Sequence, residues 1–270
     1  PSARAAAANL EWTWVDGANI QGQKGIYGTE DIANPDNVPG ARCYSVSWVD
    51  AGGNFWLFGG DAFDSTGTSG IINDLWMFDP VSQQWTWVDG SKLRLQNGVY
   101  GMEDLPGAAN VPGARNQSVT WFDANGNLWL FGGFGYDSTG AIGYLNDLWK
   151  FSPGSGQWTW VDGSNLINPN AVYGTEDVPA AANVPGPRIG SISWMDANGN
   201  LWLFGGYGRD GAINFGKLND LWMFNRTTEQ WTWVDGSNLR DQPGIYGTED
   251  VPAANNVPGA RNYATSWMDA

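Results

Sequence analysis

Short runs of alternating apolar and polar residues recur along the chain, separated by Gly, Pro, Asn and Asp. The pattern is clearest in residues 114–162, where it predicts strands at 114–123, 127–131, 145–151 and Gln157–Asp162. Asn125-Gly126 predicts a type I′ hairpin turn, because both central residues of that turn need positive φ. We expect Gly132-Gly133 to end the second strand and residues 134–144 to form a glycine-rich loop.

The whole pattern repeats at a constant interval of 73 residues, which is marked by Trp12, Trp85, Trp158 and Trp231. Four short antiparallel strands in each copy are typical of one blade of a β-propeller. We therefore expect one all-β unit over residues 1–270, with complete blades at about 41–89, 114–162 and 187–235. Partial blades are expected at both ends, as lone strands at 10–16 and 260–269.

Three blades are too few to close a propeller ring, and exposed strand edges recruit partners. We therefore expect either continuation into further repeats or self-association. The large rings at alternating strand positions predict a tryptophan-rich layer between stacked sheets, because each ring buries ~150–250 Å². The alternative interpretation of these rings is an exposed aromatic platform for sugars.

The repeat resembles the Kelch family of β-propellers in several positions of each copy. The matching residues are the double glycines Gly59-Gly60, Gly132-Gly133 and Gly205-Gly206, the third-strand aromatics Trp76, Trp149 and Trp222, the fourth-strand Trp85, Trp158 and Trp231, and the Arg that opens each first strand. The resemblance implies a propeller fold but no particular activity, because many functions share this scaffold. The period of 73 departs from the family's usual length of about 50, and the extra residues lie mainly in 90–113 and its copies.

Composition narrows the functional classes. The formal net charge is −15, which disfavours unaided binding to nucleic acid or anionic membranes. No apolar run approaches the roughly 18 residues of a membrane span, so membrane insertion is not expected. The chain has no His, and the single Cys43 permits no intrachain disulfide. The resemblance to Kelch-type copper oxidases fails for lack of His ligands.

Low Lys content and abundant Trp, Gly and Asn predict a secreted or cell-surface protein. The first residue is Pro1 rather than Met, which suggests processing or truncation with possible loss of a signal peptide. Strand order places residues 134–144 and 163–186 at the same end of the strands, on one face of the propeller. Binding usually occurs on long loops held by a rigid scaffold, so this face is the candidate for function.

Two groups of charged residues lie near that face. The first contains the ligand-binding candidates Arg42, Arg115, Arg188 and Arg261. They would bind an anion or a carboxylate-bearing peptide, or else pair with loop carboxylates or carbonyls. The second contains weak calcium candidates, Glu103, Asp104, Asp137, Glu176, Asp177 and Asp210, with equivalents at Glu30, Asp31, Asp64, Glu249 and Asp250. Solvated loops whose carboxylates cap backbone N–H groups are the alternative.

The segment 123–127 carries alternating oxygen ligands like half of a calcium loop, but it lacks the terminal Glu, which favours a simple hairpin turn. We expect no cofactor apart from possible calcium. The long loops have equal lengths, which predicts that they are ordered. Each loop should pack its Tyr against the neighbouring blade, and these residues are Tyr27, Tyr100, Tyr173 and Tyr246.

The sequence thus predicts a non-enzymatic, extracellular binding or structural scaffold that presents long loops for protein or glycan contacts. The alternative is part of a carbohydrate-active enzyme whose catalytic residues lie outside this segment. Enzymatic activity is not expected here, because residues repeated in every blade are typical of architecture, whereas an active site is normally asymmetric.

Overall fold

The computed structural model describes residues 12–266, which contain three antiparallel sheets and no helix. Blade 1 contains β1 (Arg42–Cys43), β2 (Val46–Val49), β3 (Phe55–Phe63), β4 (Ser69–Asp79) and β5 (Gln84–Asp89). Blade 2 contains β6 (Arg115–Asn116), β7 (Val119–Phe122), β8 (Leu128–Tyr136), β9 (Ile142–Ser152) and β10 (Gln157–Asp162). Blade 3 contains β11 (Arg188–Ile189), β12 (Ile192–Met195), β13 (Leu201–Arg209), β14 (Phe215–Asn225) and β15 (Gln230–Asp235).

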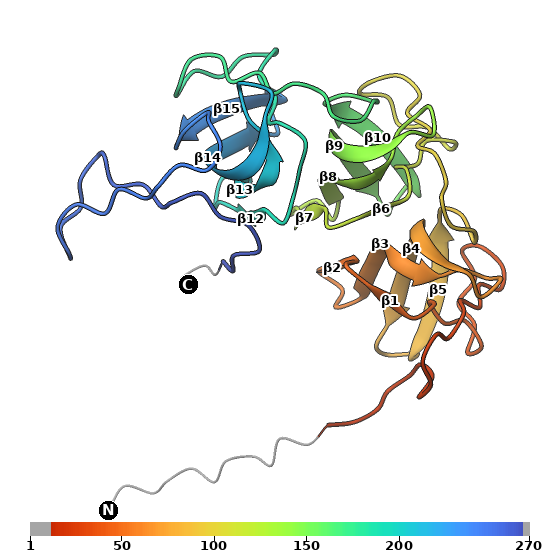
Figure 1. The fold of residues 1–270 in the computed structure, drawn as a ribbon. Helices are drawn as coiled ribbons and strands as arrows, with labels where there is room; N and C mark the ends of the chain where they lie inside the picture. Colours follow the sequence, from red (N-terminus) through yellow and green to blue (C-terminus); the bar gives the residue numbers. More distant parts are fainter. Residues whose placement is uncertain (1–11, 267–270) are drawn as a thin grey trace, which may run out of the picture.

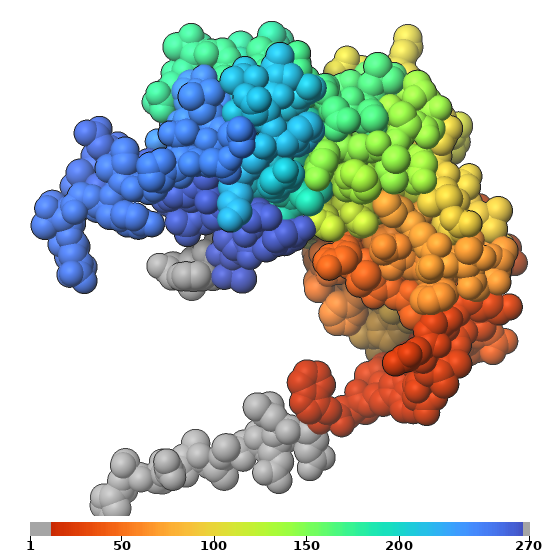
Figure 2. Space-filling view, in the orientation of Figure 1, coloured from red at the N-terminus to blue at the C-terminus, as the bar shows by residue number. Residues whose placement is uncertain are grey.

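The blades follow one another along an arc whose ends stay apart (Figures 1 and 2). In blade 1, β1 and β2 both pair with β3, which pairs with β4, which pairs with β5, and the other two sheets have the same order. Below, β1 and β2 are called the first or inner strand, β3 the second, β4 the third and β5 the outer strand of the blade, and likewise in blades 2 and 3. The all-β, propeller-like fold expected from the sequence is confirmed, and the sheets do not close into a ring. No helix in residues 12–266 is long and apolar enough to cross a membrane.

The first strand of each blade is broken, which corrects the continuous strand expected at 114–123. Gln117 has a φ of 57° and separates β6 from β7. The break lies opposite a β-bulge in β8, where the register shifts between Phe131 and Gly133. The Ser118 hydroxyl donates to the Gly132 carbonyl at 2.8 Å. The inner strand therefore bends where its partner bulges.

The sequence predicts that the double glycine ends the second strand, and this prediction is wrong. β8 continues through Gly132 and Gly133 to Tyr136, and most of the expected loop at 134–144 is strand. Both glycines have positive φ, 62° and 101°. A Cβ on Gly132 would lie 3.1 Å from the carbonyl oxygen of Arg188 in blade 3. Glycine is needed here because the next blade's inner strand approaches this backbone closely.

The turn between β7 and β8 also differs from the expected type I′ geometry. Gly126 has positive φ, whereas Asn125 does not. The Gly126 N–H donates to the Asp123 carbonyl at 2.9 Å, and the Asp123 N–H donates to the Asn127 carbonyl at 3.0 Å. This is a three-residue hairpin loop with glycine in the left-handed position. The Asn-Gly pair predicted a hairpin correctly but the wrong turn type.

The core lies between the blades and is rich in tryptophan, as the alternation predicted. One buried cluster joins blade 1 to blade 2 through Trp56, Phe58, Phe151 and Trp158. The corresponding residues of blades 2 and 3 form a second cluster. In contrast, Trp12 is fully exposed. Most of the repeated rings therefore act as packing between sheets.

Three of the long connections, 17–40, 90–113 and 163–186, cover the outer strand of the following blade. That the long loops are ordered stays a prediction. In the segment 90–113, Tyr100 is 5% exposed, and Gly107 forms an isolated bridge with Trp158. The Asn110 amide donates to the Trp158 carbonyl at 3.2 Å. Such cover blunts an outer strand edge. The expected packing of the loop tyrosines is confirmed for Tyr27, Tyr100 and Tyr173, but it is wrong for Tyr246, which is 73% exposed.

The two lone strands are not present in the described residues. Residues 12–16 and 260–266 have no strand assignment, while 10–11 and 267–269 lie outside the described part of the chain. In the complete blades, the first strands pair with the second strand and the outer strand pairs with the third. The described residues offer no such partners to these two segments, and single strands need a partner for their backbone groups.

Candidate functional site

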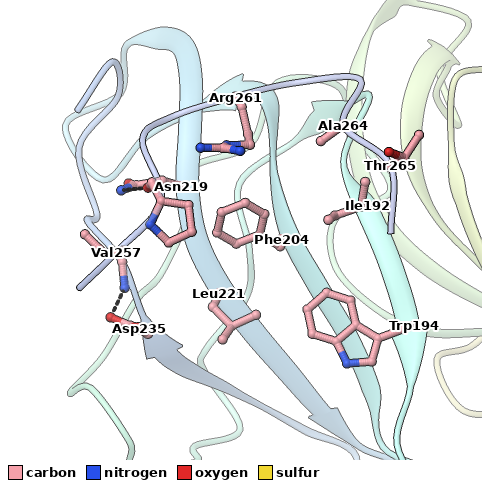
Figure 3. A pocket seen from close by; sticks show the side chains of 12 residues that line it. Ile192, Trp194, Phe204, Asn219, Leu221, Asp235, Val257, Arg261, Ala264 and Thr265 are labelled. Carbon is pink, nitrogen blue, oxygen red and sulfur yellow. Dashed lines mark hydrogen bonds between the residues drawn. The ribbon is translucent and has the colours of Figure 1, made fainter. Parts of the chain in front are cut away.

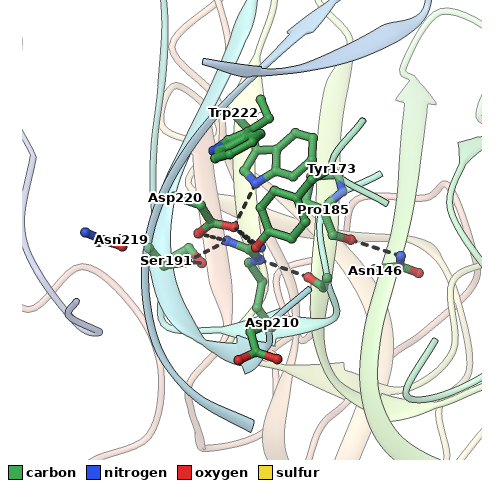
Figure 4. A network of polar contacts seen from close by, with 12 residues as sticks. Asn146, Tyr173, Pro185, Ser191, Asp210, Asn219, Asp220 and Trp222 are labelled. Carbon is green, nitrogen blue, oxygen red and sulfur yellow. Dashed lines mark hydrogen bonds and ion pairs between the residues drawn. The ribbon is translucent and has the colours of Figure 1, made fainter. Parts of the chain in front are cut away.

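A buried polar network repeats inside every blade and contains three of the four candidate arginines. In blade 2 the Arg115 guanidinium donates to both carboxylate oxygens of Asp147, at 2.6 and 2.7 Å. It also donates to the carbonyls of Gly113 and Gly132. The Asp147 carboxylate further accepts the Tyr100 hydroxyl at 2.6 Å and the Trp149 indole N–H at 2.7 Å. Figure 4 shows the equivalent network around Asp220 in blade 3.

This network shifts the pKa values of Arg115 and Tyr100. Burial alone lowers the pKa of the Arg115 guanidinium, but the paired Asp147 carboxylate more than offsets this, so the net pKa is raised. Burial and the same carboxylate raise the pKa of the Tyr100 phenol. The bidentate ion pair is charge-assisted and fully desolvated. Together with Tyr100, this ion pair joins the long loop, the inner strand and the third strand of one blade.

The arginines consequently do not form a ligand-binding ring in this structure. Arg115 and Arg188 are buried, and Arg42, in blade 1, has an 8% exposed side chain. Their guanidinium groups are occupied by Asp74, Asp147 and Asp220. Of the two interpretations left open by the sequence, the geometry corresponds to pairing with carboxylates and carbonyls. The pairing carboxylates come from the third strand of the same blade rather than from a loop.

Arg261 differs from the other three. Its guanidinium is exposed and hydrogen-bonds to the Gly259 carbonyl. It lines an apolar cavity of about 330 Å³ on the open side of blade 3, together with Trp194, Phe204 and Leu221 (Figure 3). In blade 1 the equivalent surface is covered by blade 2, and in blade 2 it is covered by blade 3. This cavity is therefore the uncovered equivalent of an interior packing surface.

The acidic candidates are not brought together into a metal site. Glu103, Asp104, Glu176 and Asp177 are exposed at the loop tips. Asp104 has a φ of 60°, and its N–H donates to the Trp160 carbonyl of the outer strand. Within residues 12–266, no group of three or more Asp, Glu or Cys side chains is arranged to hold a metal ion. The tips act as turns against the outer strands.

Asp137 and Asp210 lie in the hairpin loops between the second and third strands, where they are buried. Asp137 accepts hydrogen bonds from the backbone N–H groups of Thr139, Ala141 and Ile167. Burial raises the pKa of Asp137, but these bonds and the Thr139 hydroxyl outweigh it and hold the pKa below its usual value. Asp210 makes the equivalent backbone bonds in blade 3. Both carboxylates cap backbone N–H groups, as the alternative interpretation proposed.

The Asp123 carboxylate likewise serves its own hairpin. It accepts the N–H groups of Asn125 and Asn127 and the Trp129 indole N–H. It also forms an ion pair with Arg226 of blade 3 at 2.6 Å. The half-calcium-loop pattern is thus a hairpin turn that adds a contact between blades.

Sequence reasoning missed two half-buried carboxyls at the ends of outer strands. Burial raises the pKa of Asp162 to about 7, and the carboxylates of Glu103 and Asp104 add to this rise. Burial also raises the pKa of Asp89 in blade 1 to about 6. The equivalent Asp235 of blade 3 is exposed. The Asp-Gly sequence is the same in each copy, so only tertiary structure distinguishes these positions.

A second missed feature is a group of aromatic side chains shared by blades 2 and 3, at strand ends beyond the double glycines. Tyr144 lies 4.9 Å from Phe215, 5.3 Å from Phe134 and 6.0 Å from Tyr207, measured between ring centroids. All four are partly exposed. The Arg209 guanidinium lies 5.7 Å from the Phe215 ring. Aligning the three copies against each other would have revealed the signal, because these positions differ from blade to blade.

Comparison with known proteins adds little to this geometry. No protein-family model matches the chain, and no curated protein matches it. Among solved structures, the chain is similar to one described as "Structure of YjhT", with 17% sequence identity and a TM-score of 0.44. The match covers 72% of this chain and 52% of that one, so this chain spans about half of its length. A similarity at this level carries no argument about function.

Proposed function

We propose that this chain is a Kelch-type propeller segment that acts as a non-enzymatic, extracellular binding scaffold. Its ligand would contact the face that carries the long connections and the loops between the second and third strands. The observation that supports this is a contrast between repeated and variable positions. The Arg–Asp–Tyr–Trp network and the rings between blades are the same in each copy, whereas side chains at this face change from blade to blade.

The variable positions lie on paired strands just beyond the double glycines. They are Asp61, Phe134 and Tyr207 on the second strand, and Ile71, Tyr144 and Lys217 on the third. Repeated residues hold the architecture, and a site for a particular ligand needs asymmetry. Blades 2 and 3 supply aromatic side chains at these positions, and blade 1 does not.

The chemistry of this group favours a glycan over other ligands. Flat rings offer apolar faces on which sugar rings stack, and tyrosine adds a polar tip. Arg209 adds a cationic donor beside the rings. Aromatic residues and Arg are also enriched in protein interfaces, so a protein ligand is the second possibility within the same proposal.

The experiment is a glycan array followed by calorimetric titration of the strongest oligosaccharide. Tyr207→Ala should weaken binding by roughly tenfold or more, as expected for a central aromatic contact. Asp61→Ala is the matched control, because it occupies the same strand position in blade 1. Both variants should unfold at the wild-type temperature. Failure of every oligosaccharide to bind, or equal binding by Tyr207→Ala, would refute the glycan site, and release of new reducing ends would favour the carbohydrate-active enzyme.

A further inference from the structure

The two interfaces between blades use the same ring pairs. At the first, Trp56 lies 5.9 Å from Phe151 and Phe58 lies 5.5 Å from Trp158, between ring centroids. At the second, the corresponding distances are 6.0 Å for Trp129 with Phe224 and 5.5 Å for Phe131 with Trp231. Each interface therefore joins a trailing face, with Trp and Phe on the second strand, to a leading face, with Phe on the third strand and Trp on the outer strand.

Blade 3 exposes the trailing half of this interface. Trp202, Phe204 and Leu221 are partly exposed, whereas their equivalents in blade 2 are at most 3% exposed. Gly205 also lets another backbone segment come close to this strand, as Gly132 does in blade 2. A Cβ on Gly205 would lie 2.9 Å from the Arg261 carbonyl oxygen. The apolar cavity of about 330 Å³ described above lies on this face (Figure 3).

Blade 1 exposes the leading half. Phe55 is 47% exposed, while the equivalent Leu128 and Leu201 are fully buried. Trp85 is partly exposed, and it lines an apolar cavity of about 500 Å³ with Leu57 and Phe78. The molecule thus carries both halves of its own repeated interface on opposite ends of the arc.

The segment 244–266, here called the arm, is placed to join such a contact. It is held on blade 3 by the Asn219 amide, which donates to the Pro258 carbonyl at 3.0 Å, and by backbone bonds of Arg261 with Leu218 and Gly206. Beyond these contacts it projects from the blade (Figure 1). Tyr246 is 73% exposed, whereas the equivalent Tyr27 donates its hydroxyl to Asp74 at 2.8 Å inside blade 1.

We propose that blade 3 of one molecule packs against blade 1 of a second copy, repeating the contact between consecutive blades. Trp202 would meet Phe78 of the second copy, and Phe204 would meet its Trp85. The arm and residues 25–47 of the second copy occupy equivalent positions, so one must replace the other. The arm reads GIYGTED…NVPGARNY against GIYGTED…NVPGARCY, and it would place Tyr246 and Arg261 on Asp74 of the second copy.

This contact is heterologous, because it uses different surfaces on the two molecules. Two copies joined by two such contacts would form a ring of six blades, within the four to eight typical of propellers. The driving force is the burial of the ring pairs, which the chain already uses twice. The exchange of the arm costs little, because the two segments present the same Tyr and Arg to the same carboxylate.

The test is sedimentation velocity of the 270-residue chain over a wide range of concentrations. We expect a dimer that dissociates on dilution. Phe204→Asp and Phe55→Asp should each weaken dimerisation by roughly tenfold or more. Phe204 belongs to one of the repeated ring pairs, and Phe55 stands where Leu128 and Leu201 are fully buried between blades. Val81→Asp is the control, because Val81 is 92% exposed in the turn between β4 and β5. Circular dichroism would confirm that each variant is folded.

Mixing the two defective variants gives the sharper result. The Phe55→Asp copy retains an intact blade 3, and the Phe204→Asp copy retains an intact blade 1, so their mixture should recover a dimer through one contact. Tyr246→Phe should weaken association without changing the unfolding temperature of the monomer, because Tyr246 is exposed there. A monomer at every concentration, wild-type association by both face variants, or no recovery on mixing would overturn the proposal.

Discussion

Replacing Asp162 by Asn should stabilise the protein at alkaline pH. Asp162 ends the outer strand of blade 2, where it is partly buried close to Trp231 of blade 3 and to the loop-tip carboxylates, and its carboxylate accepts the Gly163 N–H at 2.6 Å. Burial and the nearby Glu103 and Asp104 raise its pKa to about 7. Asn keeps an oxygen acceptor for Gly163 and removes the charge. The substitution therefore relieves desolvation and repulsion and leaves the turn intact.

The sign of the pH dependence follows from linkage. The folded pKa of about 7 lies above the ordinary value of 3.8, so the folded state binds more protons between these values. The stability from the protonated group is fully present below about pH 4 and is lost as pH rises through about 7. A rise of three units corresponds to about 4 kcal/mol as an upper limit. Allowing for relaxation and water access, we expect a gain of roughly 1–3 kcal/mol near pH 8.

The assay is chemical denaturation of the wild type and of two variants near pH 8 and near pH 4. Asp235→Asn is the matched control, because Asp235 accepts the Gly236 N–H at the same 2.6 Å but is exposed. Its stability should change by less than about 0.5 kcal/mol at either pH. The gain from Asp162→Asn should vanish near pH 4. A loss of stability at pH 8, an equal gain at both pH values, or an equal gain from Asp235→Asn would refute the reasoning.

Three further predictions concern the architecture. Arg115→Ala should lower the free energy of unfolding by about 3–5 kcal/mol, since it leaves a buried carboxylate unpaired; urea denaturation measures it, with exposed Arg261→Ala near neutral at a concentration where the chain is monomeric. Gly132→Ala should destabilise strongly, because its φ is 62° and a Cβ would lie 3.0 Å from the Leu145 carbonyl oxygen. Gly126→Ala, also at positive φ but in open space, should cost only about 1–2 kcal/mol in the same assay, so equal losses would contradict the packing argument. Calcium should not raise the melting temperature in differential scanning calorimetry, because the loop-tip carboxylates are not gathered; a calcium-dependent rise would contradict this.

The sequence by itself determined the repeat, the number of complete blades and the outer strands. The fixed interval between equivalent residues placed three blades, and alternation with turn residues identified Gln157–Asp162 with its observed bounds. The burial of the repeated rings also followed, because a sheet with large rings on alternating positions needs a neighbour. Local pattern is sufficient where the structure depends on residues close in the chain.

Tertiary structure decided the break at Gln117, the passage of β8 through Gly132 and the partners of the arginines. Arg115 and Asp147 lie 32 residues apart, and nothing in the local pattern pairs them. The approach of the next blade selects the double glycine, which local rules interpret as a strand end. Asp162 and Asp235 have the same neighbours in sequence and differ in exposure, because a following blade covers one and not the other. Identical sequence segments thus have different properties, since burial depends on what packs against a residue and not on its sequence neighbours.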